Sequence, residues 1–261
     1  MTAGIEEDLQ IRSYGDASLP ALIYLPGLHG DWTLIGRFRE ALLGRVRFTE
    51  ITYPRTLTWS LEDYAAGVED VLMKQGIDRA WLLAESFASQ IIWPLIARQC
   101  LPIQGVVLAG GFVRHPVTWG VCLAERLLGS LSLGVITRIL FGYARLARAR
   151  FGRSPEMRRS IEEFIVRRTP LDLKAAQHRL HLLAVNDPCA IARASKVPIY
   201  ALSGFFDPIV PWFWVRRWLR RNCPALREYR IIWSADHNVL GTAPEKSAEQ
   251  VVHWMTLSQN N

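Results

Sequence analysis

The sequence has few cysteines and no apolar run long enough to cross a membrane, and each shortage narrows the class of protein. Four cysteines occur among its 261 residues: Cys100, Cys122, Cys189 and Cys223. Their scattered positions give no metal or redox spacing, so we expect reduced thiols in a cytoplasmic protein. The apolar stretch 127–137 is too short to span a bilayer, and Arg126 and Arg138 bound it.

The first residues also lack the features of a secretory leader. Residues 4–9 are acidic and contain no apolar h-region, so no signal peptide is expected. Half of all residues are hydrophobic and 21% are charged, which is typical of a globular protein. The length is enough for one sizeable core with an insertion.

Segments that predict strands alternate with segments that predict helices. Strands are expected over residues 9–14, 21–25, 47–53, 80–85, 104–108, 199–202 and 229–233. Helices are expected over residues 34–43, 61–75, 87–98, 212–221 and 244–256. This alternation predicts an α/β fold with a mostly parallel sheet that helices cover on both faces.

One predicted strand-to-helix junction carries a serine in a position typical of a nucleophile. The apolar strand 80–85 leads into Ser86, and an amphipathic helix follows. The neighbours Ala84 and Ala88 are small, as the close passage of strand and helix backbones requires. A serine that only caps the helix explains the same pattern. Pro94 is unusual here, because a proline inside a helix should kink it.

The string A-E-S-F-A around Ser86 resembles the nucleophile elbow of the α/β-hydrolase superfamily, G-x-S-x-G, with alanine in place of both glycines. The resemblance implies the order serine, acid, histidine along the chain. Asp207 follows the expected strand 199–202, and His237 follows the expected strand 229–233. Open α/β sheets bind ligands beyond the carboxyl ends of their strands. We therefore predict Ser86 as nucleophile, Asp207 as triad acid and His237 as general base.

Each of these residues also has a purely structural interpretation. Asp207 precedes Pro208 and could simply start a turn. His237 could be a surface histidine whose ring nitrogens are satisfied. Asp236 could be mistaken for the triad acid, but adjacent side chains in an extended segment point apart, which makes it a poor orienter of His237.

The loop after the strand 21–25 reads L-P-G-L-H-G-D and resembles the superfamily's loop that lends one backbone N–H to the oxyanion hole. Aligned on Gly27, the resemblance assigns this donor to Leu28. It assigns the second donor to Phe87, the residue after the nucleophile. An ordinary glycine-rich turn is the alternative, and His29 is expected to have a structural role.

Residues 112–196 interrupt the alternation, because they contain no convincing strand and are rich in Leu, Ala and Arg. The superfamily carries its cap at this place. We therefore expect an α/β-hydrolase core over residues 1–112 and 196–261, with a helical cap over 113–195. Residues 114–195 hold thirteen arginines and one lysine against six acidic residues, a net charge of +8, whereas the whole chain carries +7.

This basic cap could steer anionic substrates or make weak contact with an anionic membrane surface. Alternatively, its arginines only solvate the outer faces of the helices. No nucleic-acid partner is expected, because no binding motif accompanies the charge. In the aromatic, basic helix 212–221, Trp214 and Trp218 lie one turn apart. They are expected to pack against the sheet, and a membrane anchor is the alternative. His178 and His181 have a metal-binding spacing without an evident third ligand, so we expect no metal.

The resemblance implies a carboxylesterase-like serine hydrolase that uses an acyl-enzyme intermediate and no cofactor. The apolar cap suggests a small-molecule ester with a hydrophobic group. A serine at the elbow argues against the dehalogenase and epoxide-hydrolase branches, which use aspartate there. A thioesterase, lysophospholipase, lactonase or C–C hydrolase remains an alternative on the same machinery, as does a non-catalytic binding protein of this fold.

Overall fold

The computed structural model describes residues 8–130, 134–135, 142 and 162–259. These residues form a seven-stranded sheet with the strand order β1-β3-β2-β4-β5-β6-β7. The strands are β1 (Gln10–Tyr14), β2 (Ala21–Leu25), β3 (Arg47–Thr52), β4 (Ala80–Glu85), β5 (Ile103–Ala109), β6 (Ile199–Gly204) and β7 (Leu226–Ile232). The edge strand β1 runs antiparallel to β3, and the other neighbouring pairs are parallel. The predicted α/β fold with a mostly parallel sheet is confirmed.

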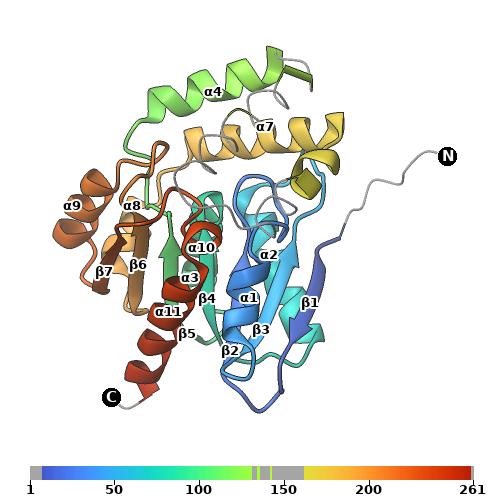
Figure 1. Ribbon diagram of the computed structural model, residues 1–261. Helices are drawn as coiled ribbons and strands as arrows, with labels where there is room; N and C mark the ends of the chain where they lie inside the picture. The colour runs from blue at the N-terminus through green and yellow to red at the C-terminus, as the bar shows by residue number, and fades with distance from the viewer. Residues whose placement is uncertain (1–7, 131–133, 136–141, 143–161, 260–261) are drawn as a thin grey trace.

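Helices cover both faces of this sheet (Figure 1). One face carries α2 (Leu61–Lys74), α3 (Ser89–Arg98), α8 (Cys189–Ala194) and α9 (Trp212–Asn222), and the other carries α1 (Gly36–Leu42), α10 (Val239–Thr242) and α11 (Pro244–Gln259). Strand side chains alternate between the two resulting cores, as a period of two requires. In β4, for example, Leu82 packs with the first group of helices and Leu83 with the second.

The predicted bounds of the strands 21–25 and 80–85 match those of the structure, whereas the last strand begins earlier than predicted. The prediction started at residue 229 because Leu226, Arg227 and Glu228 do not form an apolar run. They can nevertheless form a strand, because β7 is the edge of the sheet and Arg227 points to solvent. The strand β6 likewise continues through Ser203, whose hydroxyl is hydrogen-bonded to that of Tyr229 at 2.8 Å.

Two helices of the segment between β5 and β6 lie beyond the carboxyl ends of the strands (Figure 1). These helices are α4 (Thr118–Ser130) and α7 (Pro170–Val185), and they pack against each other. A capping box begins α7, where Thr169 and Asp172 exchange side chain-to-backbone hydrogen bonds. Part of the predicted cap (131–133, 136–141 and 143–161) lies outside the described residues, with seven of its thirteen arginines and much of the apolar stretch 127–137.

One prediction for the aromatic helix α9 is wrong. Trp218 is partly buried against the core, as expected, but the side chain of Trp214 is 50% exposed. The two residues are four positions apart and therefore only roughly on one face, and the buried face of α9 is centred on Val215 and Leu219 instead. Within the described ranges, no helix is both long and apolar enough to cross a membrane.

Candidate active site

Ser86 sits on a strained turn between β4 and the short 3₁₀ helix η1 (Ser86–Ala88), which leads into α3. Its φ of 49° lies in the left-handed region, where a residue with a side chain costs about 1–3 kcal/mol. The hydroxyl of Ser89 donates to the carbonyl oxygen of Ser86 at 2.7 Å and accepts from the N–H of Phe112 at 3.2 Å. The Ser89 hydroxyl therefore links the turn to the loop after β5, and the turn holds Ser86 at the carboxyl end of the central strand β4.

The small residues predicted around the elbow lie in tight surroundings. Ala84 and Ala88, which stand where the elbow motif usually has glycines, are fully buried. The loop after β2 also passes close, because a Cβ atom on Gly27 would lie 3.6 Å from that of Ser86. The structure therefore accommodates alanine at both positions, inside the buried core.

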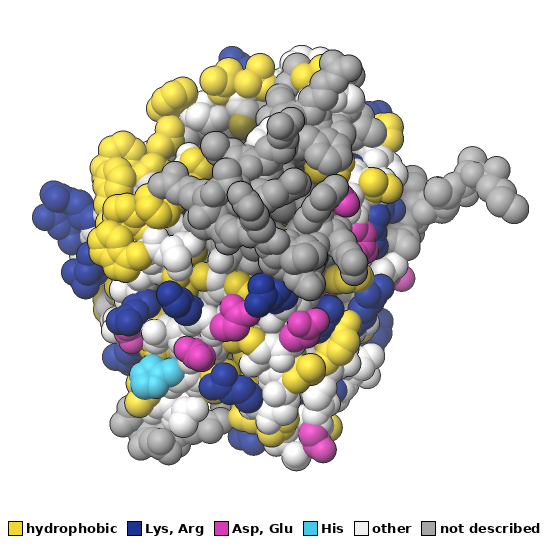
Figure 2. All heavy atoms as spheres, viewed as in Figure 1, with side chains coloured by type: hydrophobic (Ala, Val, Ile, Leu, Met, Phe, Trp, Pro, Cys, Tyr) yellow, Lys and Arg dark blue, Asp and Glu magenta, His cyan; other side chains and the backbone are white. Residues whose placement is uncertain are grey.

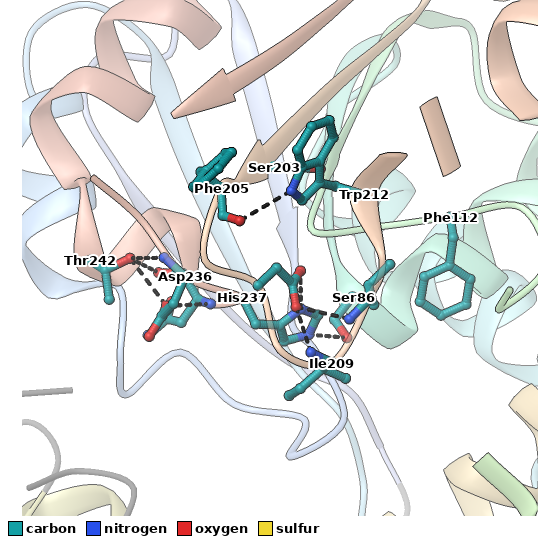
Figure 3. A network of polar contacts seen from close by, with 12 residues as sticks. Ser86, Phe112, Ser203, Phe205, Ile209, Trp212, Asp236, His237 and Thr242 are labelled. Atoms are coloured by element: carbon teal, nitrogen blue, oxygen red, sulfur yellow. Dashed lines mark hydrogen bonds and ion pairs between the residues drawn. The ribbon is translucent and has the colours of Figure 1, made fainter. Parts of the chain in front are cut away.

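Ser86, His237 and Asp207 form one continuous hydrogen-bonded chain, of which Figure 3 labels Ser86 and His237. His237 Nε2 lies 2.9 Å from Ser86 Oγ, and His237 Nδ1 lies 2.8 Å from Asp207 Oδ2. The other carboxylate oxygen of Asp207 accepts from the N–H groups of Ile209 and Val210, both at 2.8 Å. The three residues follow β4, β7 and β6, so parallel strands bring together groups that are far apart in the sequence.

The surroundings of His237 stabilise the charged imidazolium form of its ring. Burial alone would lower its pKa. The hydrogen bond and charge of Asp207 raise the pKa, and the negative charges of Glu85 and Asp236 raise it further. The net result is a pKa above the ordinary value near 6.5. With the Nδ1 proton held by Asp207, Nε2 is free to accept the proton of the Ser86 hydroxyl.

Asp236, the other acid beside His237, points to different partners. Its carboxylate accepts from the N–H of Asn238 at 2.9 Å and from the hydroxyl of Thr242 at 3.2 Å (Figure 3). The segment is held close to β6, because a Cβ atom on Gly204 would lie 2.0 Å from the carbonyl oxygen of Asp236. Asp236 thus fixes the turn after β7, while Asp207 contacts the imidazole.

Leu28 and Phe87 carry the two amides predicted for an oxyanion hole. The carbonyl of Gly27 accepts from the N–H of Gly30 at 3.0 Å, which makes Leu28 a central residue of a tight turn. Phe87 is the second residue of η1, and the first N–H groups of a helix have no acceptor within the helix. In the described loop and 3₁₀ helix, both amides therefore stand at positions where the local turn itself supplies no acceptor.

Glu85, the residue before Ser86, places a second carboxylate near this turn. It accepts a short hydrogen bond from the hydroxyl of Tyr24 on the neighbouring strand. Burial raises its pKa, although the Tyr24 hydrogen bond, the charge of His237 and the N–H of Gly27 act against burial. Glu85 stands at the variable position just before the serine of the elbow motif, and because any residue fits there, the sequence alone gives it no role.

Two buried arginines from the segment between β5 and β6 hold the loop that carries Leu28. Arg179 on α7 donates to the carbonyl oxygens of Leu28 and Pro54, each at 2.9 Å, and its Nε lies 3.3 Å from the hydroxyl of Tyr64. Arg168 forms a short ion pair with Asp31. A sequence that is rich in exposed arginine gives no signal for the two that are buried, so both were missed.

The other histidines considered as candidates, His29, His178 and His181, make structural contacts. The ring of His29 packs edge-on against Phe164, with 4.6 Å between centroids. His178 Nε2 is hydrogen-bonded to the carbonyl of Trp59 at 2.8 Å, and His181 pairs with Glu125 at 3.1 Å. In the part of the chain that the structure describes, no three His, Cys, Asp or Glu side chains are grouped to hold a metal.

Comparisons with known proteins identify the fold. No protein-family model and no curated protein sequence matches the chain. Among solved structures, an α/β hydrolase enzyme from a Medee basin deep-sea metagenome library is similar with a TM-score of 0.78, at 13% identity over 95% of this chain and 94% of the other. A thermophilic esterase from Thermogutta terrifontis gives 0.77, at 18% identity over 96% and 93%. An enol-lactonase from Burkholderia xenovorans gives 0.75, at 17% identity over 95% and 96%.

These structures share the architecture of the chain across nearly its whole length. The protein therefore has the α/β-hydrolase fold, as the elbow motif predicted. At such low identity the likeness concerns the fold alone, and function has to be argued from the site.

Proposed function

We propose that the protein is a serine hydrolase that cleaves carboxylic esters through an acyl-enzyme intermediate. The observation that carries the proposal is the hydrogen-bonded chain from Ser86 through His237 to Asp207. A nucleophile within reach of a base that a third group orients is the arrangement that activates a serine hydroxyl. The positive φ of Ser86 supports the same role, because strain of this kind collects at functional sites.

In the proposed reaction, Ser86 Oγ attacks the ester carbonyl while His237 Nε2 takes the hydroxyl proton. Asp207 holds the Nδ1–H tautomer and stabilises the imidazolium that forms. The N–H groups of Leu28 and Phe87 stabilise the oxyanion, and each donor is worth roughly 10²–10³ in rate. His237 then returns the proton to the leaving alcohol. Water hydrolyses the acyl-enzyme with His237 again as base, and the reaction needs neither metal nor cofactor.

We further propose that residues 113–195 form a cap over Ser86. The substrate is then a small ester with a hydrophobic group, and we propose a cytoplasmic location for the protein. The cap proposal is supported by α7, whose Arg179 reaches the loop of Leu28. Large apolar side chains on α4 support a hydrophobic substrate, because Leu123 and Leu127 remain about half exposed there. The esterase and the enol-lactonase with the same fold act on ester bonds, which agrees with this substrate class.

Hydrolysis of p-nitrophenyl esters from acetate to palmitate tests the proposal. The wild-type protein is expected to hydrolyse one or more of them, and Ser86→Ala is expected to be inactive with unchanged folding. Ser234→Ala, at an exposed serine in the turn after β7, is the matched control and should keep full activity. The dependence on chain length would measure the space available to the acyl group.

A fluorophosphonate probe gives a second, substrate-independent test. The probe should label the wild-type protein on Ser86, and neither Ser86→Ala nor heat-unfolded protein should react. A folded wild-type protein that neither reacts with the probe nor cleaves any ester would sink the hydrolase proposal and favour a non-catalytic binding role.

A further inference from the structure

An exposed aromatic surface lies beside the site, on a part of the molecule that the proposed reaction does not use. Its members come from the loop after β6, from the first turn of α9 and from the turn after β7. Their exposed fractions are 38% for Phe206, 54% for Ile209, 52% for Phe213, 50% for Trp214 and 68% for Trp233. Large exposed apolar patches are rare on globular proteins and usually mark binding surfaces.

The rings form one connected series. Trp233 stacks on Phe205 at 4.3 Å between centroids, and Phe205 also contacts Phe206 at 5.0 Å. Phe205 contacts Trp212 at 5.9 Å, and the series continues through Phe213 to Trp214 at 5.8 and 5.2 Å. The exposed rings are therefore one continuous surface.

Partly buried hydrogen bonds hold this surface in place. Trp212 Nε1 donates to the carbonyl oxygen of Phe205 at 3.1 Å (Figure 3), and the hydroxyl of Tyr229 donates to the carbonyl of Trp212 at 3.2 Å. Binding to such a surface orders few further side chains, which favours association.

Arginines adjoin the aromatic rings. Phe213, Trp214, Arg217, Arg220 and Arg221 share the exposed face of α9, with the rings in its first turn and the arginines in the following turns. Arg227 and Arg230 are exposed on the neighbouring strand β7. Figure 2 shows the hydrophobic side chains gathered on the side where Figure 1 places α9, with basic side chains next to them.

The charge of this region is one-sided. Residues 205–234 contain six arginines and only two acids, Asp207 and Glu228. Asp207 is bound to His237, and Glu228 accepts from Trp254 Nε1. Among the described residues, the five exposed arginines (Arg217, Arg220, Arg221, Arg227 and Arg230) form no ion pair with a carboxylate.

We propose that this aromatic–arginine surface binds the surface of an anionic lipid membrane. Tryptophan and phenylalanine insert at the boundary between headgroups and acyl chains, while arginines beside them pair with anionic headgroups. A second copy of the chain fits poorly, since a two-fold interface would bring the exposed arginines of both copies into one contact area without acids to balance them. The surface differs from the predicted basic cap, because α9 and β7 belong to the core.

The aromatic–arginine surface adjoins the loop of Asp207, so membrane binding would bring the proposed active site close to the lipid. Phe206 and Ile209 flank Asp207, and the N–H of Ile209 donates to the Asp207 carboxylate. Docking would therefore bring the loop of the predicted triad acid against the lipid. If the proposed hydrolase activity holds, an ester dissolved in the membrane could reach the site without crossing bulk water. The binding itself does not depend on that activity.

Sedimentation with vesicles tests the binding. The wild-type protein is expected to bind vesicles of phosphatidylcholine containing phosphatidylglycerol at low salt, to bind less at high salt, and to bind pure phosphatidylcholine weakly. The double variant Arg217→Gln/Arg221→Gln should weaken binding about 25-fold, because each arginine near an anionic surface contributes about fivefold. Phe213→Ser/Trp214→Ser should weaken it by about tenfold or more at every salt concentration.

Matched controls replace an exposed arginine and an exposed apolar residue outside the aromatic–arginine surface. Arg45→Gln removes an exposed arginine from the turn before β3, and Met73→Ser removes a 60% exposed apolar side chain from α2. Both should bind vesicles like the wild-type protein. All variants should keep the wild-type circular dichroism spectrum and the same activity on a water-soluble ester.

Three outcomes would overturn the proposal: no binding at low salt, equal binding to neutral and anionic vesicles, or unchanged binding by both double variants. A wild-type dimer in analytical ultracentrifugation that Trp214→Ser converts to a monomer would assign the surface to a second copy instead. Loss of ester hydrolysis in Ser86→Ala with unchanged vesicle binding would separate this inference from the proposed enzymatic function.

Discussion

Arg179 donates a hydrogen bond to the carbonyl oxygen of Leu28 across 2.9 Å, and so joins α7 to the loop after β2. The residue is only 2% exposed, and its remaining donors reach the carbonyl of Pro54 and the hydroxyl of Tyr64. Burying a charge is costly unless hydrogen bonds compensate it, so this arginine is held by a specific geometry. A Cβ atom on Gly30 would lie 2.7 Å from a guanidinium nitrogen of Arg179, so a larger residue would displace the arginine, and the φ of 78° at this position also favours glycine.

Arg179 is therefore expected to position the oxyanion hole from a distance. Arg179→Met removes the guanidinium donor from the buried carbonyl oxygen of Pro54 and the partly buried one of Leu28. An unsatisfied buried acceptor costs about 1–3 kcal/mol of stability, and the partly buried one should cost less. The kcat for a soluble ester should fall by roughly tenfold, part of the effect of losing one oxyanion donor. KM should change little, because the loop orients a transition-state contact.

Arg179→Lys is the conservative comparison, because lysine keeps the charge and can still reach one carbonyl. It should recover part of kcat and part of the stability. Steady-state kinetics and thermal unfolding on the same samples separate the two effects. A lower Tm in Arg179→Met with unchanged kcat would make Arg179 a structural link only.

The strain at Ser86 predicts a difference between two inactive variants. Ser86→Ala and Ser86→Gly should both lower kcat by roughly 10⁴–10⁶, as the loss of a triad nucleophile does. Glycine tolerates the φ of 49°, whereas alanine keeps the strain, so Ser86→Gly should be the more stable by about 1 kcal/mol.

Chemical denaturation measures this difference. Ser234, an exposed serine without a positive φ, provides the control pair, and there glycine should be less stable than alanine. Equal stability of the two Ser86 variants would mean that the turn carries no strain.

Some features of the site follow from local sequence patterns, and others depend on contacts between distant residues. The meeting of Ser86, Asp207 and His237 could be predicted because each follows a strand with a recognisable pattern, and strand ends meet at one edge of a parallel sheet. Arg179, 151 positions from Leu28, and the pair of Arg168 with Asp31 could not be predicted. Nothing in the local pattern separates a buried arginine from the exposed ones around it. Trp214 was mispredicted for the opposite reason, since an aromatic residue in an amphipathic helix is usually buried.

The two acids near His237 allow a direct test of which one orients the imidazole. Asp207→Asn should lower kcat by about 10⁴, because the asparagine no longer favours the Nδ1–H tautomer. Asp236→Asn should lower kcat far less, because Asp236 contacts Asn238 and Thr242. Its main effect should be on stability. Kinetics of both variants on one ester decide between them, and a larger loss in Asp236→Asn would move the triad acid to that position.

Glu85 is expected to set the pH range of activity through His237. His237 must be neutral to accept the Ser86 proton, so activity is lost as pH falls through its pKa. Although burial lowers this pKa, Asp207 and then Glu85 raise it, with a net shift upward. Glu85→Gln removes one of these charges and keeps a hydrogen-bond acceptor for Tyr24. The acid limb of the kcat/KM profile should therefore move to lower pH, with the plateau nearly unchanged.

Glu40→Gln, at an exposed glutamate on α1, makes the same charge change away from the site and should leave the profile in place. Rate measurements across the acid range, with the folded state checked by circular dichroism at each pH, give the comparison. An acid limb that stays in place in Glu85→Gln would show that Glu85 is protonated, or screened from His237, when the enzyme works. A plateau that collapses would show instead that the carboxylate is needed to hold the loop of Gly27 against the elbow, since the N–H of Gly27 helps to stabilise its charge.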